Sequence, residues 1–152
     1  MFVLAASRRA VTHAQYEQIE RLYRGDEVLD GLVLSEDLRW AMLFALVRGG
    51  LGTEADIKEL REEDNTLTGE QNAARARATF NAPEVRLQTW EAVMHDVSIP
   101  NDTRWAMVAG FWSHATTIPA TYAQYVEKFY DQVARVWDEH TFHIASGIVL
   151  EL

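Results

Sequence analysis

Apolar residues recur along this chain at intervals of three and four, the spacing that gathers side chains on one face of an α-helix. The stripe is widest after Pro119, which predicts the longest helix, from residue 120 to about residue 139. We expect this stripe to pack into the core. Its members are Tyr122, Tyr125, Val126, Phe129, Tyr130, Val133, Val136 and Trp137.

Capping side chains mark where the predicted helices begin. Thr12 and Thr68 are each followed three residues later by Gln, the spacing of a capping box. Ser35 precedes an acidic first turn, which the helix dipole favours. Between the helices that Thr12 and Ser35 begin, residues 26–34 form a connector, and we expect its apolar side chains to tuck under the next helix.

One apolar motif occurs twice. Residues 37–42 and residues 102–107 both fit Asp-x-Arg-Trp-Ala-Met, with an offset of 65 residues between Asp37 and Asp102. Each copy leads into an apolar run, and the run from residue 38 to residue 47 is apolar on every side. A helix with that pattern is buried all round. The motif therefore predicts two equivalent inner helices of a repeat.

These patterns predict an all-α fold with about seven or eight helices joined by short links. The offset spans two helix pairs, or roughly 32 residues a pair, which is in the range of α-solenoid units. We expect a HEAT-like, right-handed superhelix of antiparallel helix pairs, forming a single helical-repeat domain over residues 1–152. Both ends of the sequence are apolar, so we expect a piece of a larger C-terminal domain, truncated at both ends.

Composition narrows the class of partner. The net charge is −9, and the basic residues form only two small groups, Arg8 with Arg9 and Arg75 with Arg77. Nucleic acid and anionic membrane are therefore not expected as partners. There is no cysteine, which excludes disulfides and thiolate metal sites, and no stretch reaches the length of a membrane span. These features are typical of a cytoplasmic protein.

The two arginines of the repeated motif are the first candidates for chemistry. A buried guanidinium needs a carboxylate or carbonyl partner. We expect Arg39 and Arg104 to pair with acidic groups on neighbouring helices and to fix the register of those helices, with the motif residues Asp37, Trp40, Asp102 and Trp105 in structural roles. The alternative is that Arg39 or Arg104 faces a concave surface and binds the carboxylate of a substrate.

The other reactive side chains show no catalytic pattern. His140 and His143 lie three apart, whereas the zinc-protease signature needs His-Glu-x-x-His, so we expect surface or helix-end histidines and no metal site. The acidic groups 62–64 and 138–139 end helices, and we expect both to be solvated. From the residues alone, the chain is a helical-repeat module without catalytic residues.

Several segments resemble the C-terminal helical domain of actinobacterial aminopeptidase N, a member of the zinc gluzincin aminopeptidases. The resemblance covers roughly residues 13–150, with segments in the same order and with similar spacing. The segments that carry it are Ser35-Glu36-Asp37-Leu38-Arg39-Trp40, Thr68-Gly69-Glu70, Ala73-Ala74-Arg75-Ala76, Trp90-Glu91-Ala92-Val93, Ala109-Gly110-Phe111, Tyr125-Val126-Glu127-Lys128-Phe129-Tyr130 and Val136-Trp137.

The resemblance implies a parent enzyme that removes N-terminal residues from peptides, with zinc in its catalytic domain. The family's His-Glu-x-x-His and Gly-x-Met-Glu-Asn motifs do not occur here, so no catalytic or metal residue carries over and the chain alone should be inactive. The implied role is to close over the active site and shape the substrate chamber, with the catalytic domain of the same polypeptide and peptide substrates as partners. The alternative is a stand-alone helical-repeat interaction module.

Overall fold

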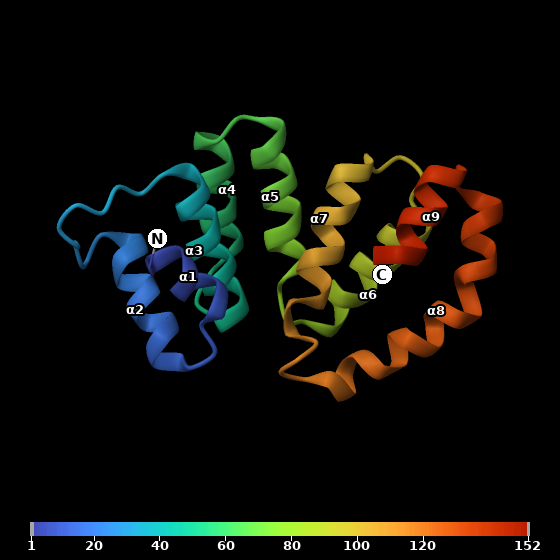
Figure 1. The fold of residues 1–152 in the computed structure, drawn as a ribbon, viewed down its shortest axis with the longest axis horizontal. Helices are drawn as coiled ribbons and strands as arrows, with labels where there is room; N and C mark the ends of the chain where they lie inside the picture. Colours follow the sequence, from blue (N-terminus) through green and yellow to red (C-terminus); the bar gives the residue numbers. More distant parts are fainter. Residues whose placement is uncertain (1, 152) are drawn as a thin grey trace.

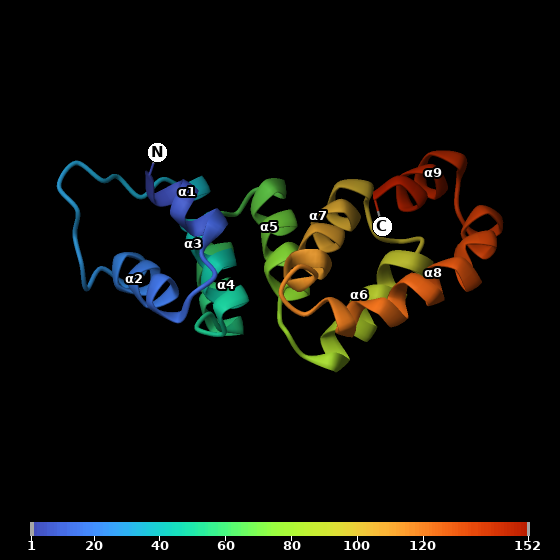
Figure 2. The same cartoon turned by 60° about the horizontal axis from the view of Figure 1, so that its bottom comes forward.

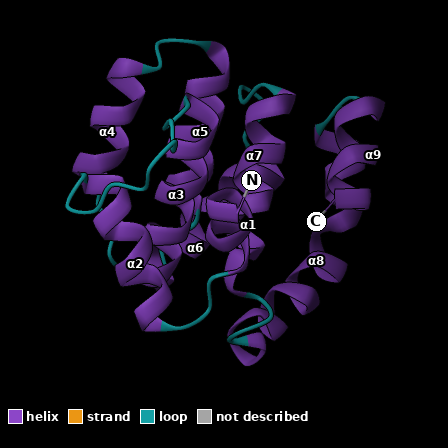
Figure 3. Ribbon diagram, turned by 60° about the vertical axis from the view of Figure 1, so that its left-hand side comes forward, coloured by secondary structure: helices purple, strands orange, loops and turns teal. Residues whose placement is uncertain are grey.

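The computed structural model describes residues 2–151, and within them the chain forms nine α-helices and one 3-10 turn (Figure 1). The all-α prediction is confirmed, with slightly more helices than expected. Coloured by secondary structure, the same residues contain helix and loop only (Figure 3). The elements are α1 Phe2–Arg9, α2 His13–Arg24, α3 Glu36–Gly49, α4 Glu54–Glu63, α5 Leu67–Ala78, α6 Pro83–His95, α7 Asn101–Phe111, η1 Trp112–His114, α8 Pro119–Glu139 and α9 Phe142–Glu151.

Alternate helices contact one another along the molecule. Helices α1, α3, α5, α7 and α9 form one row, each packed on the next, while α2, α4, α6 and α8 flank that row (Figures 1 and 2). Each helix packs mainly on neighbours one or two places away in chain order. The right-handed superhelix stays a prediction. Between residues 2 and 151, no helix has both the length and the apolarity that crossing a bilayer requires.

Local capping explains most helix ends. Thr12 and Gln15 form the predicted capping box, and Gly25 ends α2 in the left-handed conformation at φ 82°. The predicted box at Thr68 is wrong, because the cap of α5 lies two residues earlier in the chain. Thr66 has an extended backbone and its hydroxyl accepts the Gly69 N–H at 3.0 Å, so Thr66 is the cap and Thr68 lies inside the first turn.

The first copy of the repeated motif lies at the centre of the N-terminal half. Helix α3 is enclosed by α1, α2, α4 and α5, and both Trp40 and Met42 are buried. In the second copy, Trp105 and Met107 are only half-buried, because α7 packs mainly on α5, α6 and α9. The prediction of an inner helix buried all round is therefore confirmed for α3 and holds less completely for α7.

Two apolar segments are more exposed than the pattern predicts. On α8, Tyr122, Tyr125 and Val136 are buried, but Val126, Tyr130 and Trp137 are exposed because α8 packs on α6 and α9 along one side only. The exposed fraction of Tyr130 is 73%. In the connector, Leu32 and Leu34 are half-buried, whereas Leu29 and Val33 are exposed. The expectation that the apolar set Leu29, Leu32, Val33 and Leu34 tucks under α3 is therefore wrong for Leu29 and Val33.

Helices α5 and α7 meet at a close crossing. Helix α5 supplies alanines, of which Ala73, Ala76 and Ala78 are buried, and α7 supplies Gly110. A Cβ added at Gly110 would collide with the carbonyl oxygen of Arg75 and would lie 2.8 Å from the Ala78 Cβ. The two backbones therefore approach closely because neither helix places a large side chain between them.

Candidate functional site

A cavity of about 550 Å³ lies between α1, α3 and α5. Three arginines line it, one from each helix: Arg8 from α1, Arg48 from α3 and Arg75 from α5. The apolar part of its wall includes Trp40, Ala41 and Phe44, and Asp37 and Asn72 add a carboxylate and an amide. A volume of this size is typical of sites that bind small molecules.

A second cavity of about 330 Å³ shares two of these arginines. Arg8 and Arg48 line both cavities, and the second one also includes Arg9, Tyr16 and His114. The hydroxyl of Ser113, on the wall of the second cavity, is buried and has no hydrogen-bond partner among the described atoms. The two cavities therefore form one basic region along the row of odd-numbered helices.

Arg48 is held in place by backbone and hydroxyl oxygens. Its guanidinium donates to the carbonyl oxygens of Ser7 and Ala10, both at 3.1 Å, and its Nε donates to the Tyr16 hydroxyl at 3.3 Å. The Tyr16 hydroxyl in turn donates to the Ala10 carbonyl at 2.8 Å. These bonds connect the end of α3 to the link between α1 and α2, so the cation has a fixed position.

Arg75 lies over an aromatic ring. Its guanidinium carbon is 4.5 Å from the centroid of the Phe44 ring, within the range of a cation–π interaction. Burial, followed by repulsion from Arg8 and Arg48, lowers the pKa of Arg75, but an arginine stays protonated at neutral pH. Arg8 and Arg48 are therefore close enough to Arg75 to repel its charge.

The sequence-predicted residue Arg39 lies outside this cavity. It pairs with Glu63 at the end of α4, with Nη2 donating to Oε1 at 3.2 Å. The hydrogen bond to Arg39 lowers the pKa of Glu63. An acidic partner on a neighbouring helix is what the structural interpretation of Arg39 expects, and it leaves substrate binding by Arg39 without a supporting contact.

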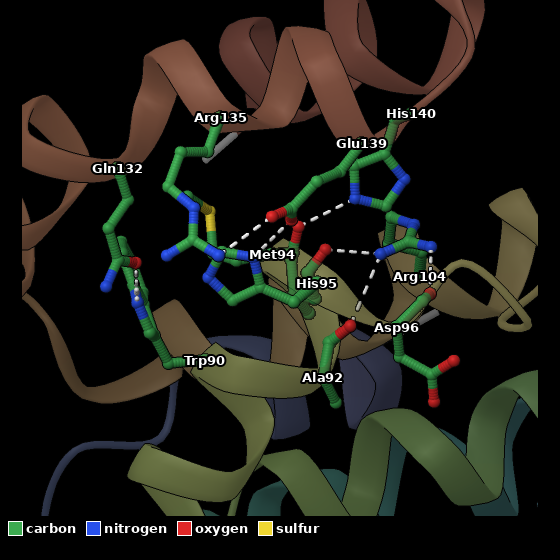
Figure 4. A network of polar contacts seen from close by, with 11 residues as sticks. Trp90, Ala92, Met94, His95, Asp96, Arg104, Gln132, Arg135, Glu139 and His140 are labelled. Atoms are coloured by element: carbon green, nitrogen blue, oxygen red, sulfur yellow. Dashed lines mark hydrogen bonds and ion pairs between the residues drawn. The ribbon is translucent and has the colours of Figure 1, made fainter.

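Arg104 has a different kind of partner from the one predicted. Its side chain is completely buried, and its guanidinium donates to carbonyl oxygens at the end of α6 and in the link that follows (Figure 4). The acceptors include Ala92 at 3.3 Å, Asp96 at 2.6 Å and Ile99 at 3.4 Å, together with Val93. An acidic side-chain partner was therefore the wrong expectation, and the enclosed group offers no surface to a substrate.

The other motif residues have separate positions. Trp40 donates its Nε1–H to Asp64 Oδ2 at 2.8 Å, and Asp37 lies on the wall of the arginine cavity. Asp102 is exposed in the first turn of α7, and Trp105 packs against Gly147 of α9. The structure therefore does not bring the six motif residues together into one site.

Asp64 contradicts the prediction of a solvated acidic group at residues 62–64. It is 4% exposed and accepts hydrogen bonds from Trp40 and from the Thr66 hydroxyl, the latter at 2.6 Å. The bond from Thr66 contributes most to the low pKa of Asp64. This carboxylate connects α3, α4 and the cap of α5.

Polar contacts also join α6 to the end of α8 (Figure 4). Glu139 contacts His95 Nδ1 at 2.8 Å and accepts from Arg135 at 2.9 Å. The bond from His95 is the main reason that the pKa of Glu139 is lowered. The acidic group 138–139 was predicted to be solvated, but Glu139 uses its carboxylate within the chain.

His140 is the C-cap of α8, so it is one of the predicted helix-end histidines, but its side chain is buried. Its Nε2 lies 2.7 Å from the carbonyl oxygen of Met94 (Figure 4). His143 is exposed. Over residues 2–151, no three His, Cys, Asp or Glu side chains come close enough to hold a metal ion together. His140 is therefore bound to the backbone of α6 and not paired with His143.

His114 is the second buried histidine, and it makes stability depend on pH. Its Nε2 donates to the carbonyl of Thr79 at 2.9 Å, and burial lowers its pKa below the ordinary 6.5. The unfolded chain therefore binds this proton more tightly than the folded chain. We expect the free energy of unfolding to fall as the pH drops through about 6.5, until the folded histidine also protonates.

Thermal unfolding at several pH values measures this effect. Replacing His114 with glutamine keeps a donor for the Thr79 carbonyl and removes the titration, so the melting temperature of the variant should change less between about pH 7.5 and pH 5.5. The exposed His13, replaced by glutamine, is the control and should behave like the original chain. The same pH dependence in both variants would contradict this assignment.

The three arginines of the cavity were not selected as site residues from the sequence. Arg8 and Arg75 belong to the two small basic groups seen there, whereas Arg48, in the last turn of α3, belongs to neither group. Their proximity could not be predicted from the sequence, because these residues are separated by 40 and 27 positions and come together only when α1, α3 and α5 pack. The basic groups were the only sequence feature that could have indicated the site.

The fold and the site define the chain as an all-helical domain. The polar side chains described above mostly bind partners within the chain, and the remaining candidate site is the basic cavity between α1, α3 and α5. The family described as ERAP1-like C-terminal domain matches residues 2–151, so this chain belongs to that family. It is 29% identical over 148 residues to aminopeptidase N of Streptomyces lividans. That alignment covers 97% of this chain and 17% of the relative's length. The resemblance found in the sequence is confirmed.

Proposed function

We propose that this chain is a non-catalytic part of the C-terminal helical domain of a zinc-dependent aminopeptidase N, which removes N-terminal residues from peptides. In this role it closes over the active site and shapes the substrate chamber. The observation that carries the proposal is the family match over residues 2–151, together with the Streptomyces aminopeptidase N to which 97% of the chain aligns. A cytoplasmic location is part of the same proposal.

The proposal assigns the chemistry to another part of the polypeptide. The chain contains no His-Glu-x-x-His sequence, the motif that supplies two zinc ligands and a general base in this class of peptidase. The zinc ion would be held by the catalytic domain of the same polypeptide, which is the proposed partner. The basic cavity between α1, α3 and α5 is the part of this chain best suited to contact an anionic group of a peptide substrate.

A stand-alone helical-repeat interaction module is the second candidate. The exposed apolar residues of α8, Val126, Tyr130 and Trp137, favour it because an apolar helix face is suited to packing against a partner. The same surface would also serve the first proposal, as a contact with the rest of a larger enzyme. The reading frame around this sequence separates the two candidates.

An activity assay tests the proposal that catalysis belongs to another domain of the polypeptide and not to this chain. The 152-residue chain, supplied with zinc, should not release the chromophore from an amino-acid anilide, whereas the polypeptide of the full reading frame should. A matching His-Glu-x-x-His upstream of this sequence would support the aminopeptidase, and a frame that begins at Met1 would favour the interaction module. Turnover by the 152-residue chain itself would contradict both candidates.

A further inference from the structure

We propose that the cavity lined by Arg8, Arg48 and Arg75 is an oxyanion-binding site, which takes the carboxylate or phosphate group of a small ligand. The inference concerns binding by this chain alone. It therefore stands or falls separately from the proposed role in an aminopeptidase.

The first argument is the pattern of ion pairs. The chain has 23 acidic residues against 14 lysines and arginines, so carboxylates are plentiful. Five other arginines take carboxylate partners, namely Arg21, Arg24, Arg39, Arg77 and Arg135. Among the described residues, seven arginines form no such ion pair, and three of these, Arg8, Arg48 and Arg75, line this one cavity. The positive charges of these three arginines are therefore not neutralised by an ion pair within the chain.

The second argument is the concentration of positive charge around one cavity. Arg8, Arg48 and Arg75 all line it, and after burial, repulsion from Arg8 and Arg48 contributes to the lowered pKa of Arg75. Asp37 is a carboxylate on the same wall, and one negative charge leaves three guanidinium groups incompletely balanced. An anion with one or two charges would relieve this repulsion and would accept charge-assisted hydrogen bonds.

The third argument is that two of the arginines are held in place before any ligand binds. Arg48 is fixed by the carbonyls of Ser7 and Ala10, and Arg75 by the Phe44 ring. Fixed donors lose little conformational freedom when they bind an anion, so more of the interaction energy contributes to affinity. Arg8 is exposed on the short helix α1 and can adjust to the ligand.

The walls indicate the kind of molecule that carries the anion. Trp40, Ala41 and Phe44 form an apolar surface beside the arginines, and Asn72 supplies a neutral amide. At about 550 Å³ the cavity has room for more than a single inorganic ion. We therefore expect a ligand with an apolar or aromatic body next to its oxyanion, such as an N-acylated aromatic amino acid or an aryl phosphate.

Isothermal titration calorimetry at low, matched ionic strength tests the site in the 152-residue chain. The probes are inorganic phosphate, phenyl phosphate, N-acetylphenylalanine and its uncharged amide. We expect phenyl phosphate, N-acetylphenylalanine or both to bind, and the amide to bind at least about tenfold more weakly than the free acid if the carboxylate is the source. Binding of phosphate compounds alone would identify a phosphate ester as the source.

Matched variants connect any binding to these residues. Replacing Arg75 with glutamine, or Arg8 with glutamine, should weaken binding of the better probe at least about tenfold. Arg77, on the same helix and paired with Glu54 outside this cavity, is the control and should leave the affinity unchanged when replaced by glutamine. Equal affinities in all three variants, or no heat of binding for any probe with the original chain, would overturn the proposal.

Discussion

Replacing Arg104 with methionine is expected to lower the free energy of unfolding by about 2–3 kcal/mol. The guanidinium is completely buried and donates to the carbonyls of Ala92, Val93, Asp96 and Ile99. Methionine fills similar space but donates nothing, so the carbonyls of Val93 and Ile99 lose this donor, while those of Ala92 and Asp96 keep a backbone N–H donor. Urea unfolding followed by tryptophan fluorescence measures the loss.

The first copy of the repeated motif supplies the matched control. Arg39 occupies the equivalent position in α3, but its side chain is 29% exposed and it pairs with Glu63, whose own side chain is 47% exposed. Replacing Arg39 with methionine should cost less than about 1 kcal/mol, because exposed ion pairs contribute little. Losses of similar size at the two arginines would show that the carbonyl contacts of Arg104 are not the cause.

Valine at position 110 is expected to destabilise the chain by about 3 kcal/mol, at the upper end of what overpacking usually costs. Even a Cβ at this position meets the backbone carbonyl of Arg75 and the Cβ of Ala78, so α5 and α7 must separate. Backbone atoms on the facing helix have no rotamer through which they can move aside. The change in the denaturation midpoint measures the effect.

Ala109 is the matched control for Gly110 because it lies on the same helix and is exposed. Valine there should cost only a few tenths of a kcal/mol, the difference in helix propensity between alanine and valine. Because valine has a higher helix propensity than glycine, propensity cannot explain a loss at Gly110. If valine cost no more at position 110 than at position 109, the close crossing of α5 and α7 would not be what disfavours a side chain there.

Local signals predicted most of the secondary structure. Thr12 with Gln15, Ser35 and Pro119 define helix starts through interactions within a few residues, and such signals can be recognised in one sequence. The fully apolar pattern of α3 likewise predicted burial on all sides. Thr66 was missed because Thr68 has the same chemistry and a better-placed glutamine, so the sequence alone did not separate the two caps.

Partners across the fold were harder to predict. The partner of Arg104 is a set of backbone carbonyls and not a carboxylate, and a partner of Asp64 is the indole of Trp40. Both depend on how neighbouring helices pack. His140 was predicted as a surface or helix-end histidine, and its burial could not be predicted because its contact with Met94 spans 46 positions. The basic cavity could not be predicted from the sequence for the same reason, because residues from three helices form it.

The family was recognisable although the site was not. The segments that carry the resemblance extend over most of the chain in a fixed order, and the family matches residues 2–151. Binding residues of a helical domain follow no short motif. The resemblance therefore identified the family and its all-helical architecture more readily than any residue that contacts a ligand.

The contact pattern between helices has a kinetic consequence. Every extensive helix–helix contact joins elements that are neighbours or next-neighbours in chain order, so few long loops must close before native contacts form. Proteins dominated by such short-range contacts fold in microseconds to milliseconds. Each newly formed helix pair gives the next pair a surface on which to assemble, so this chain is suited to fold progressively while it is still being synthesised.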